Sequence, residues 1–135
     1  MLIVQYRNMR DIVQSWWKQA EADFVNSKKN RDNKAYYLAV FLCQQAIEKG
    51  LKAVYIYSKN TTTGQIHSLV YLAQQVEMPQ KFMGFMRKLA PQYVTTRYPD
   101  AAYGTPDEIY DKEIADEYIT KTEEVMVWLE QKLAK

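Results

Sequence analysis

The chain has 135 residues, of which 47% are hydrophobic and 25% charged, and its formal net charge is +2. This length suits a single domain over residues 1–135 and leaves no room for a second hydrophobic core. The composition is typical of a soluble globular protein, and four glycines and four prolines are too few for a turn-rich β fold. The net charge is too small to predict nucleic-acid binding from the overall field, so such a role requires a local site.

The single cysteine, Cys43, excludes an internal disulfide and suits a reducing compartment. The apolar start at residues 1–4 is too short for a signal peptide, and no apolar run reaches membrane-spanning length. We therefore expect a cytoplasmic protein with no membrane contact. The chain also has one histidine, His67, so a transition-metal site made of soft ligands is not expected, and neither is a cofactor.

A first helix is predicted from a cap at Asn8 or Asp11 to about Lys28. Its inward face recurs at three- and four-residue spacing: Ile12, Trp16, Ala20, Asp23, Phe24 and Ser27. Trp16 and the adjacent Trp17 point about 100° apart, so they do not both face the same core. One of the two is therefore a candidate for a partner surface.

Residues 36–57 predict a central helix that is apolar around most of its circumference. Its polar residues fall within an arc of roughly 140°; they are Gln44, Gln45, Glu48, Lys49 and Lys52. Cys43 lies on the apolar side, where a free cysteine usually acts as a small hydrophobe. We expect this helix to be buried in a bundle, antiparallel to the first helix, with one polar stripe left for another purpose.

The second half of the chain predicts two short helices and one long helix. The short ones cover residues 66–76 and the Phe82–Leu89 region, separated by Met78–Pro79. Residues 92–109 have no clear period and read as a long ordered loop, and loops of that length are often functional. The last helix should run from about Asp107 to Leu133. Together these elements predict an all-α, antiparallel up-and-down helical bundle of three long helices plus two short ones.

Four stretches, taken in order, resemble the HEPN family (higher eukaryotes and prokaryotes nucleotide-binding). Residues 44–53, Gln-Gln-Ala-Ile-Glu-Lys-Gly-Leu-Lys-Ala, are similar to the family's signature helix. The other three are Trp17 with Ala20, Asp23 and Phe24, then His67-Ser68-Leu69, then Tyr93-Val94-Thr95-Thr96-Arg97-Tyr98-Pro99-Asp100. The ordered set spans nearly the whole chain.

The resemblance implies a helical bundle that commonly forms homodimers and often lies beside a small nucleotidyltransferase in toxin–antitoxin pairs. Some family members are metal-independent ribonucleases with an Arg followed after four to six residues by a His, where Arg holds the phosphate and His acts as general acid or base. Here residues 98–103 after Arg97 are Tyr-Pro-Asp-Ala-Ala-Tyr, without a histidine. We therefore expect a binding or interaction module. Two alternatives remain open: a ribonuclease in which His67 replaces the missing histidine, and a purely structural dimeric adaptor.

Seven residues are candidates for binding a nucleotide or RNA phosphate: Arg97, Tyr98, Asp100, His67, Glu48, Lys49 and Lys52. Arg97 could grip a phosphate while Tyr98 stacks on a base. Alternatively, Arg97 pairs with Asp100 or Glu48 and holds the loop in place.

The other candidates also have two interpretations. His67 could contact a ligand or fix the loop by hydrogen bonds. Glu48, Lys49 and Lys52 could line a polar cleft beside the Arg97 loop, although Glu48 and Lys52 also have the favourable i, i+4 ion-pair order. Tyr103 lies near the place where similar proteins carry a tyrosine that a partner enzyme adenylylates, but the register does not match.

Overall fold

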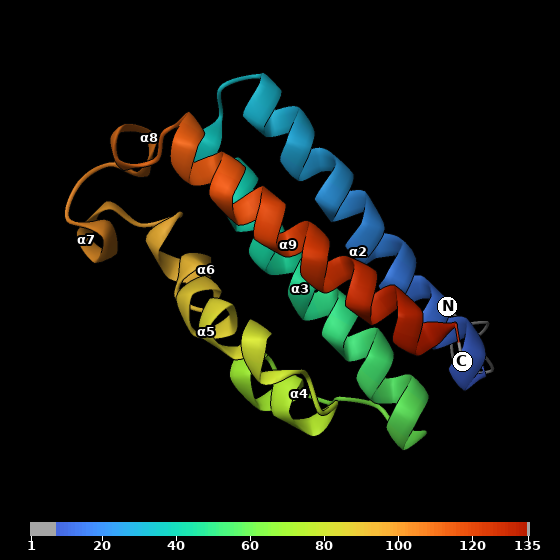
Figure 1. Cartoon of the computed structure of the whole chain (residues 1–135). Helices are drawn as coiled ribbons and strands as arrows, with labels where there is room; N and C mark the ends of the chain where they lie inside the picture. The colour runs from blue at the N-terminus through green and yellow to red at the C-terminus, as the bar shows by residue number, and fades with distance from the viewer. Residues whose placement is uncertain (1–7, 135) are drawn as a thin grey trace, which may run out of the picture.

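The computed structural model describes residues 8–134, and the regular structure in that range is helical. Figure 1 shows three long helices lying side by side: α2 (Met9–Asp32), α3 (Tyr36–Lys59) and α9 (Lys112–Leu133). Two shorter helices, α4 (Leu69–Gln75) and α5 (Gln80–Leu89), lie along this body, followed by the single turns α6 (Gln92–Thr95), α7 (Pro99–Ala102) and α8 (Pro106–Ile109). The predicted all-α bundle of three long and two short helices is confirmed. Within residues 8–134, no helix is both long and apolar enough to cross a membrane.

The long helices do not all alternate in direction. A short link makes α2 and α3 antiparallel, and α4 to α8 then carry the chain back, so that α9 runs in the same direction as α3 (Figure 1). Consequently, Met9 at the start of α2, Ile56 near the end of α3 and Leu133 at the end of α9 line one groove of about 800 Å³. Both termini of the described chain lie at this end of the bundle.

Helix α3 is the centre of the core, packing against α2, α9, α4, α6 and α8. Its fully or almost fully buried apolar residues are Ala39, Val40, Cys43, Ala46, Ile47, Leu51, Ala53, Val54 and Ile56. Gly50 allows a close approach of α9 and α2 to α3, because a Cβ there would lie 2.9 Å from Cδ1 of Leu129 and 3.3 Å from the Trp17 ring. The burial of Cys43 confirms its predicted position on the apolar side.

Helix α2 begins as predicted but extends further. The Asn8 side chain accepts a hydrogen bond from the Asp11 amide at 2.8 Å, so Asn8 is the cap. The inward face is confirmed from Ala20 onward, whereas Trp16 is half-buried. Trp17 is half-buried too and packs against the core. The helix continues past Lys28 to Asp32, and Arg31 in its last turn forms an ion pair with Asp116 of α9.

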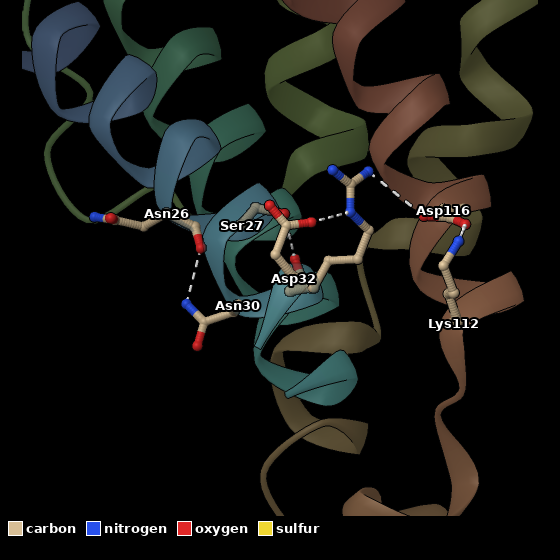
Figure 2. Close-up of polar contacts among 8 residues, drawn as sticks. Asn26, Ser27, Asn30, Asp32, Lys112 and Asp116 are labelled. Carbon is tan, nitrogen blue, oxygen red and sulfur yellow. Dashed lines mark hydrogen bonds and ion pairs between the residues drawn. The ribbon is translucent and has the colours of Figure 1, made fainter. Parts of the chain in front are cut away.

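A small ion-pair network of Arg31, Asp32, Lys112 and Asp116 (Figure 2) lies at the end of the bundle opposite the termini (Figure 1). Nη1 of Arg31 lies 3.4 Å from Oδ1 of Asp116, and Nζ of Lys112 lies 2.7 Å from Oδ2 of the same carboxylate. Arg31 also contacts Asp32 at 3.2 Å. The network connects the end of α2 to the beginning of α9. Its members are partly exposed, so each pair contributes little stability, about 0–1 kcal/mol.

Three predicted boundaries differ from the structure. The helix expected from residue 66 begins at Leu69, because Ser68 caps it by accepting a hydrogen bond from the Tyr71 amide at 3.2 Å. The stretch predicted as a loop, residues 92–109, contains α6, α7 and α8. The last helix begins at Lys112 rather than near 107, because Tyr110 is extended and Asp111 caps a new helix.

Candidate functional site

Three of the predicted site residues meet where α3 faces the connection to α4. Nδ1 of His67 lies 3.0 Å from Oε2 of Glu48 and 3.0 Å from Nζ of Lys52. The Glu48 carboxylate also forms an ion pair with Lys52 at 3.0 Å, in the predicted i, i+4 relation. The Lys52 and Glu48 side chains are only 4% and 12% exposed, whereas that of His67 is 63% exposed. The imidazole therefore covers a largely buried ion pair.

Burial by itself would raise the pKa of Glu48. Hydrogen bonds from His67 and Lys52, the charge of Lys52 and a hydrogen bond from Gln44 outweigh that effect, so the pKa of Glu48 is lowered from its ordinary value of 4.5. Glu48 is consequently a carboxylate at neutral pH and acts as the acceptor at the centre of this cluster.

Two glutamines extend the cluster along α3. Nε2 of Gln44 donates to Oε1 of Glu48 at 3.3 Å, and Nε2 of Gln45 donates to Oε1 of Gln44 at 2.7 Å. Gln44 is 2% exposed and Gln45 is half-buried. A continuous row of hydrogen bonds therefore runs from Gln45 to Glu48.

A pocket of about 500 Å³ lies beside this row. It is enclosed by α3, the start of α4 and the junction of α5 and α6; its lining residues are Gln44, Gln45, Glu48, His67, Ser68, Leu69, Ala90, Tyr93 and Val94. This volume lies within the range of small-molecule sites. We call it the Gln45 pocket.

Arg97 contacts aromatic rings rather than carboxylates. Its guanidinium carbon is 4.4 Å from the centroid of the Tyr93 ring, 5.1 Å from that of Tyr98 and 5.9 Å from that of Phe41. Nη2 of Arg97 also donates to the Tyr98 hydroxyl at 2.7 Å. Hydrogen bonds with Tyr98 and then Tyr93 raise the pKa of Arg97. The alternative in which Arg97 pairs with Asp100 or Glu48 is wrong, because the ion pairs found among residues 8–134 do not include Arg97.

The remaining two candidates lie elsewhere. Lys49 points to α2, where its Nζ is 2.5 Å from Oδ2 of Asp23, whose other oxygen accepts from Gln19 at 2.9 Å. Asp100 is an exposed residue in the first turn of α7. The structure thus brings Glu48, Lys52 and His67 together, places Arg97 and Tyr98 beside the pocket through Tyr93, and separates Lys49 from both groups.

Four residues of this region were not predicted as site residues: Gln44, Gln45, Tyr93 and Phe41. The signal for the glutamines was available, because both fall in the polar stripe of the central helix. Nothing in the sequence connected Phe41 to Tyr93, whose ring centroids lie 6.1 Å apart. Among residues 8–134, no group of three His, Cys, Asp or Glu side chains is arranged to hold a metal ion.

Comparisons with known proteins agree with this fold. A protein named "Putative toxin MJ1304" from Methanocaldococcus jannaschii is 28% identical over 121 residues, which are 81% of this chain and 80% of that protein. The crystal structure of TT1696 from Thermus thermophilus matches with a TM-score of 0.80 and 25% identity, over 89% of this chain and 97% of that one. The crystal structure of ST0689, an archaeal HEPN homologue, matches with a TM-score of 0.76 and 32% identity, over 89% and 96%. The model of the HEPN domain family matches residues 13–132, and the chain therefore belongs to the HEPN domain family.

Proposed function

We propose that this HEPN domain is a binding and interaction module that takes the phosphate of a nucleotide or of RNA at Arg97. The observation that carries the proposal is an exposed guanidinium held among the rings of Tyr93, Tyr98 and Phe41, next to a pocket that Tyr93 also lines. No carboxylate within residues 8–134 forms an ion pair with this guanidinium. Its charge is thus available to an anion.

The arrangement suits a phosphate for a geometric reason. Aromatic rings lie against the guanidinium, and one N–H donates to Tyr98, so further N–H groups of the planar fork stay available. Such a fork binds phosphate oxygens in pairs, and neighbouring aromatic rings can stack on a base. Held in one place by the rings, Arg97 also loses less conformational entropy on binding than a free surface arginine.

Isothermal titration calorimetry and thermal unfolding with mononucleotides and short RNAs test the proposal. A ligand present at tenfold its Kd should raise the Tm by roughly 5 °C. Arg97→Ala should weaken binding about tenfold or more, whereas Arg87→Ala, which removes an exposed arginine of α5, should leave it unchanged. Wild-type protein that binds none of these ligands, or an Arg97→Ala variant that is folded and binds equally well, would contradict the proposal.

We also propose that the module works in a toxin–antitoxin pair with a small nucleotidyltransferase. The toxin name of the relative from Methanocaldococcus jannaschii supports this role. Tyr103 is the contact point that we favour, because its side chain is 99% exposed and its left-handed backbone (φ 58°) presents it between α7 and α8. The partner would join the phenol oxygen of Tyr103 to the α-phosphate of a nucleoside triphosphate, with release of pyrophosphate and the phenol proton.

Mass spectrometry after incubation with such a nucleotidyltransferase and a nucleoside triphosphate tests this part. We expect one nucleotidyl group on the peptide that contains Tyr103, and none on Tyr103→Phe. Modification of Tyr57 instead, which is 45% exposed, would contradict the assignment.

A homodimer is proposed as well, and light scattering on a size-exclusion column should give twice the chain's 15.9 kDa.

The ribonuclease alternative has its own test. Cleavage of RNA in the presence of EDTA by the wild type, with activity lost in both Arg97→Ala and His67→Ala, would establish the enzyme in place of the binding module. We expect no cleavage, because the Arg-to-His spacing of the nucleases is absent after Arg97.

A further inference from the structure

The orientation of the two glutamine amides beside the Gln45 pocket follows from Glu48. An ionised carboxylate accepts hydrogen bonds but has no proton to donate, so Gln44 must turn its NH2 group toward Glu48. The Gln44 carbonyl oxygen then faces Gln45, which must turn its own NH2 group toward it, at 2.7 Å. The row of hydrogen bonds can therefore run in one direction only, from Gln45 to Glu48.

The end of this row is Gln45, a lining residue of the pocket. Its carbonyl oxygen takes part in no hydrogen bond found among residues 8–134, and one of its two N–H groups also stays available. Because the Gln45 amide donates into a row that ends on a carboxylate, polarisation along the row makes this carbonyl a stronger acceptor. The pocket thus presents a strengthened hydrogen-bond acceptor, the carbonyl oxygen of Gln45, next to a donor, the free N–H of the same amide.

A planar base with an exocyclic amino group fits the free carbonyl and N–H groups of the Gln45 amide. Adenine offers an amino donor next to a ring-nitrogen acceptor, and Gln and Asn side chains recognise that pair with two hydrogen bonds. Tyr93 lines the same pocket and supplies an aromatic ring. The same ring lies 4.4 Å from the Arg97 guanidinium, which would place the phosphate end of a nucleotide at Arg97 while its base enters the pocket.

We propose that the Gln45 pocket receives an adenine base and that Gln45 reads its exocyclic amino group. The inference rests on the proposed function, since it takes Arg97 as the phosphate-binding residue of the same ligand. It adds a base preference that phosphate binding alone does not require.

Calorimetric titration with AMP, IMP and ribose 5-phosphate tests it. IMP has the size and phosphate of AMP but carries a carbonyl in place of the amino group. Wild-type protein should bind AMP about tenfold more tightly than IMP. Gln45→Ala should bind the two equally, whereas Gln74→Ala, which removes an exposed glutamine of α4, should keep the preference. Arg97→Ala should weaken the binding of all three ligands by a similar factor and leave the ratio of the AMP and IMP affinities unchanged.

The outcomes separate the two proposals. Equal binding of AMP and IMP by the wild type, with both lost in Arg97→Ala, would overturn the adenine assignment and keep the phosphate site. The same conclusion follows if ribose 5-phosphate binds as tightly as AMP. If none of the three ligands binds, the adenine assignment fails; the proposed function fails as well only if the short RNAs also do not bind. Circular dichroism of each variant confirms that the helical bundle is intact before affinities are compared.

Discussion

Nζ of Lys49 lies 2.5 Å from Oδ2 of Asp23, in an ion pair that joins α3 to α2. The Asp23 side chain is only 8% exposed, and Lys49 is 23% exposed. Gln19 donates to the second oxygen of Asp23, so both oxygens of the carboxylate have partners. This pair separates Lys49 from its neighbours in the polar stripe and assigns it to the interface between the two helices.

Lys49→Met should therefore lower stability without changing ligand binding. Removing the cation leaves a buried carboxylate with one neutral partner, which costs about 3 kcal/mol. Urea unfolding measures the loss. The double variant Asp23→Leu with Lys49→Met should regain most of it, because an apolar pair of similar volume replaces a buried ion pair at little cost. A single variant as stable as the wild type, or one that loses nucleotide affinity while folded, would contradict this role.

Glu48 should make the stability depend on acid pH. Burial opposes its ionisation, but His67 and Lys52 hold its pKa below 4.5 in the folded protein. A carboxyl whose pKa is depressed on folding stabilises the protein fully above its unfolded pKa, and this contribution is lost as the pH falls through the lower folded value. Urea unfolding from pH 7 down to pH 3 should therefore show a smaller loss of stability in Glu48→Gln. At pH 7 the same variant should be about 2 kcal/mol less stable, because Lys52 loses its buried partner. An unchanged pH profile in the variant would exclude this contribution.

Two helical glycines should respond in opposite ways to alanine. A methyl group at Gly50 would lie 2.9 Å from Leu129 in the core, so Gly50→Ala should destabilise the protein by about 1–3 kcal/mol despite the better helix propensity of alanine. At Gly84 in α5, such a methyl group would have no atom within 4 Å apart from those of its chain neighbours and its own helix backbone, and Gly84→Ala should stabilise by about 0.5–1 kcal/mol. Thermal unfolding of the two variants side by side measures both. A Gly50→Ala variant as stable as the wild type would contradict the packing at Gly50, and a destabilised Gly84→Ala variant would contradict the open space at Gly84.

Cys43 should be unreactive in the folded protein. It is completely buried, and burial raises the pKa of its thiol above 9.0 although Ser27 and Thr122 act in the opposite direction. A thiol-specific reagent such as dithionitrobenzoate should release colour only when urea unfolds the chain, since the thiolate is the reactive form. Fast labelling without denaturant would show that the interface between α2, α3 and α9 opens readily.

The long helices were predictable because their periodicity is a local property of the chain. The starts of α2 and α3 agree with the predictions, since a capping asparagine and the polar residues that end at Asn33 act on neighbouring residues. The start of α9 was predicted about five residues too early. Pro106 and the acidic residues after it do begin a helix, but that helix is the single turn α8. The extended backbone at Tyr110 and the cap at Asp111 separate α8 from α9.

By itself, the sequence determined the fold class and the membership of the HEPN family, because apolar spacing and ordered motifs are preserved along the chain whatever its packing. The sequence also identified the polar stripe of α3, which contains three of the candidate site residues. The i, i+4 spacing also indicated the ion pair of Glu48 with Lys52. Only the tertiary structure decided the partners from other elements: Asp23 of α2 for Lys49, and His67 for Glu48. It likewise placed Arg97 near the ring of Phe41 in α3 rather than beside a carboxylate. The physical reason is that these contacts join residues far apart in the chain, and the packing of the helices decides which of several possible partners comes within reach.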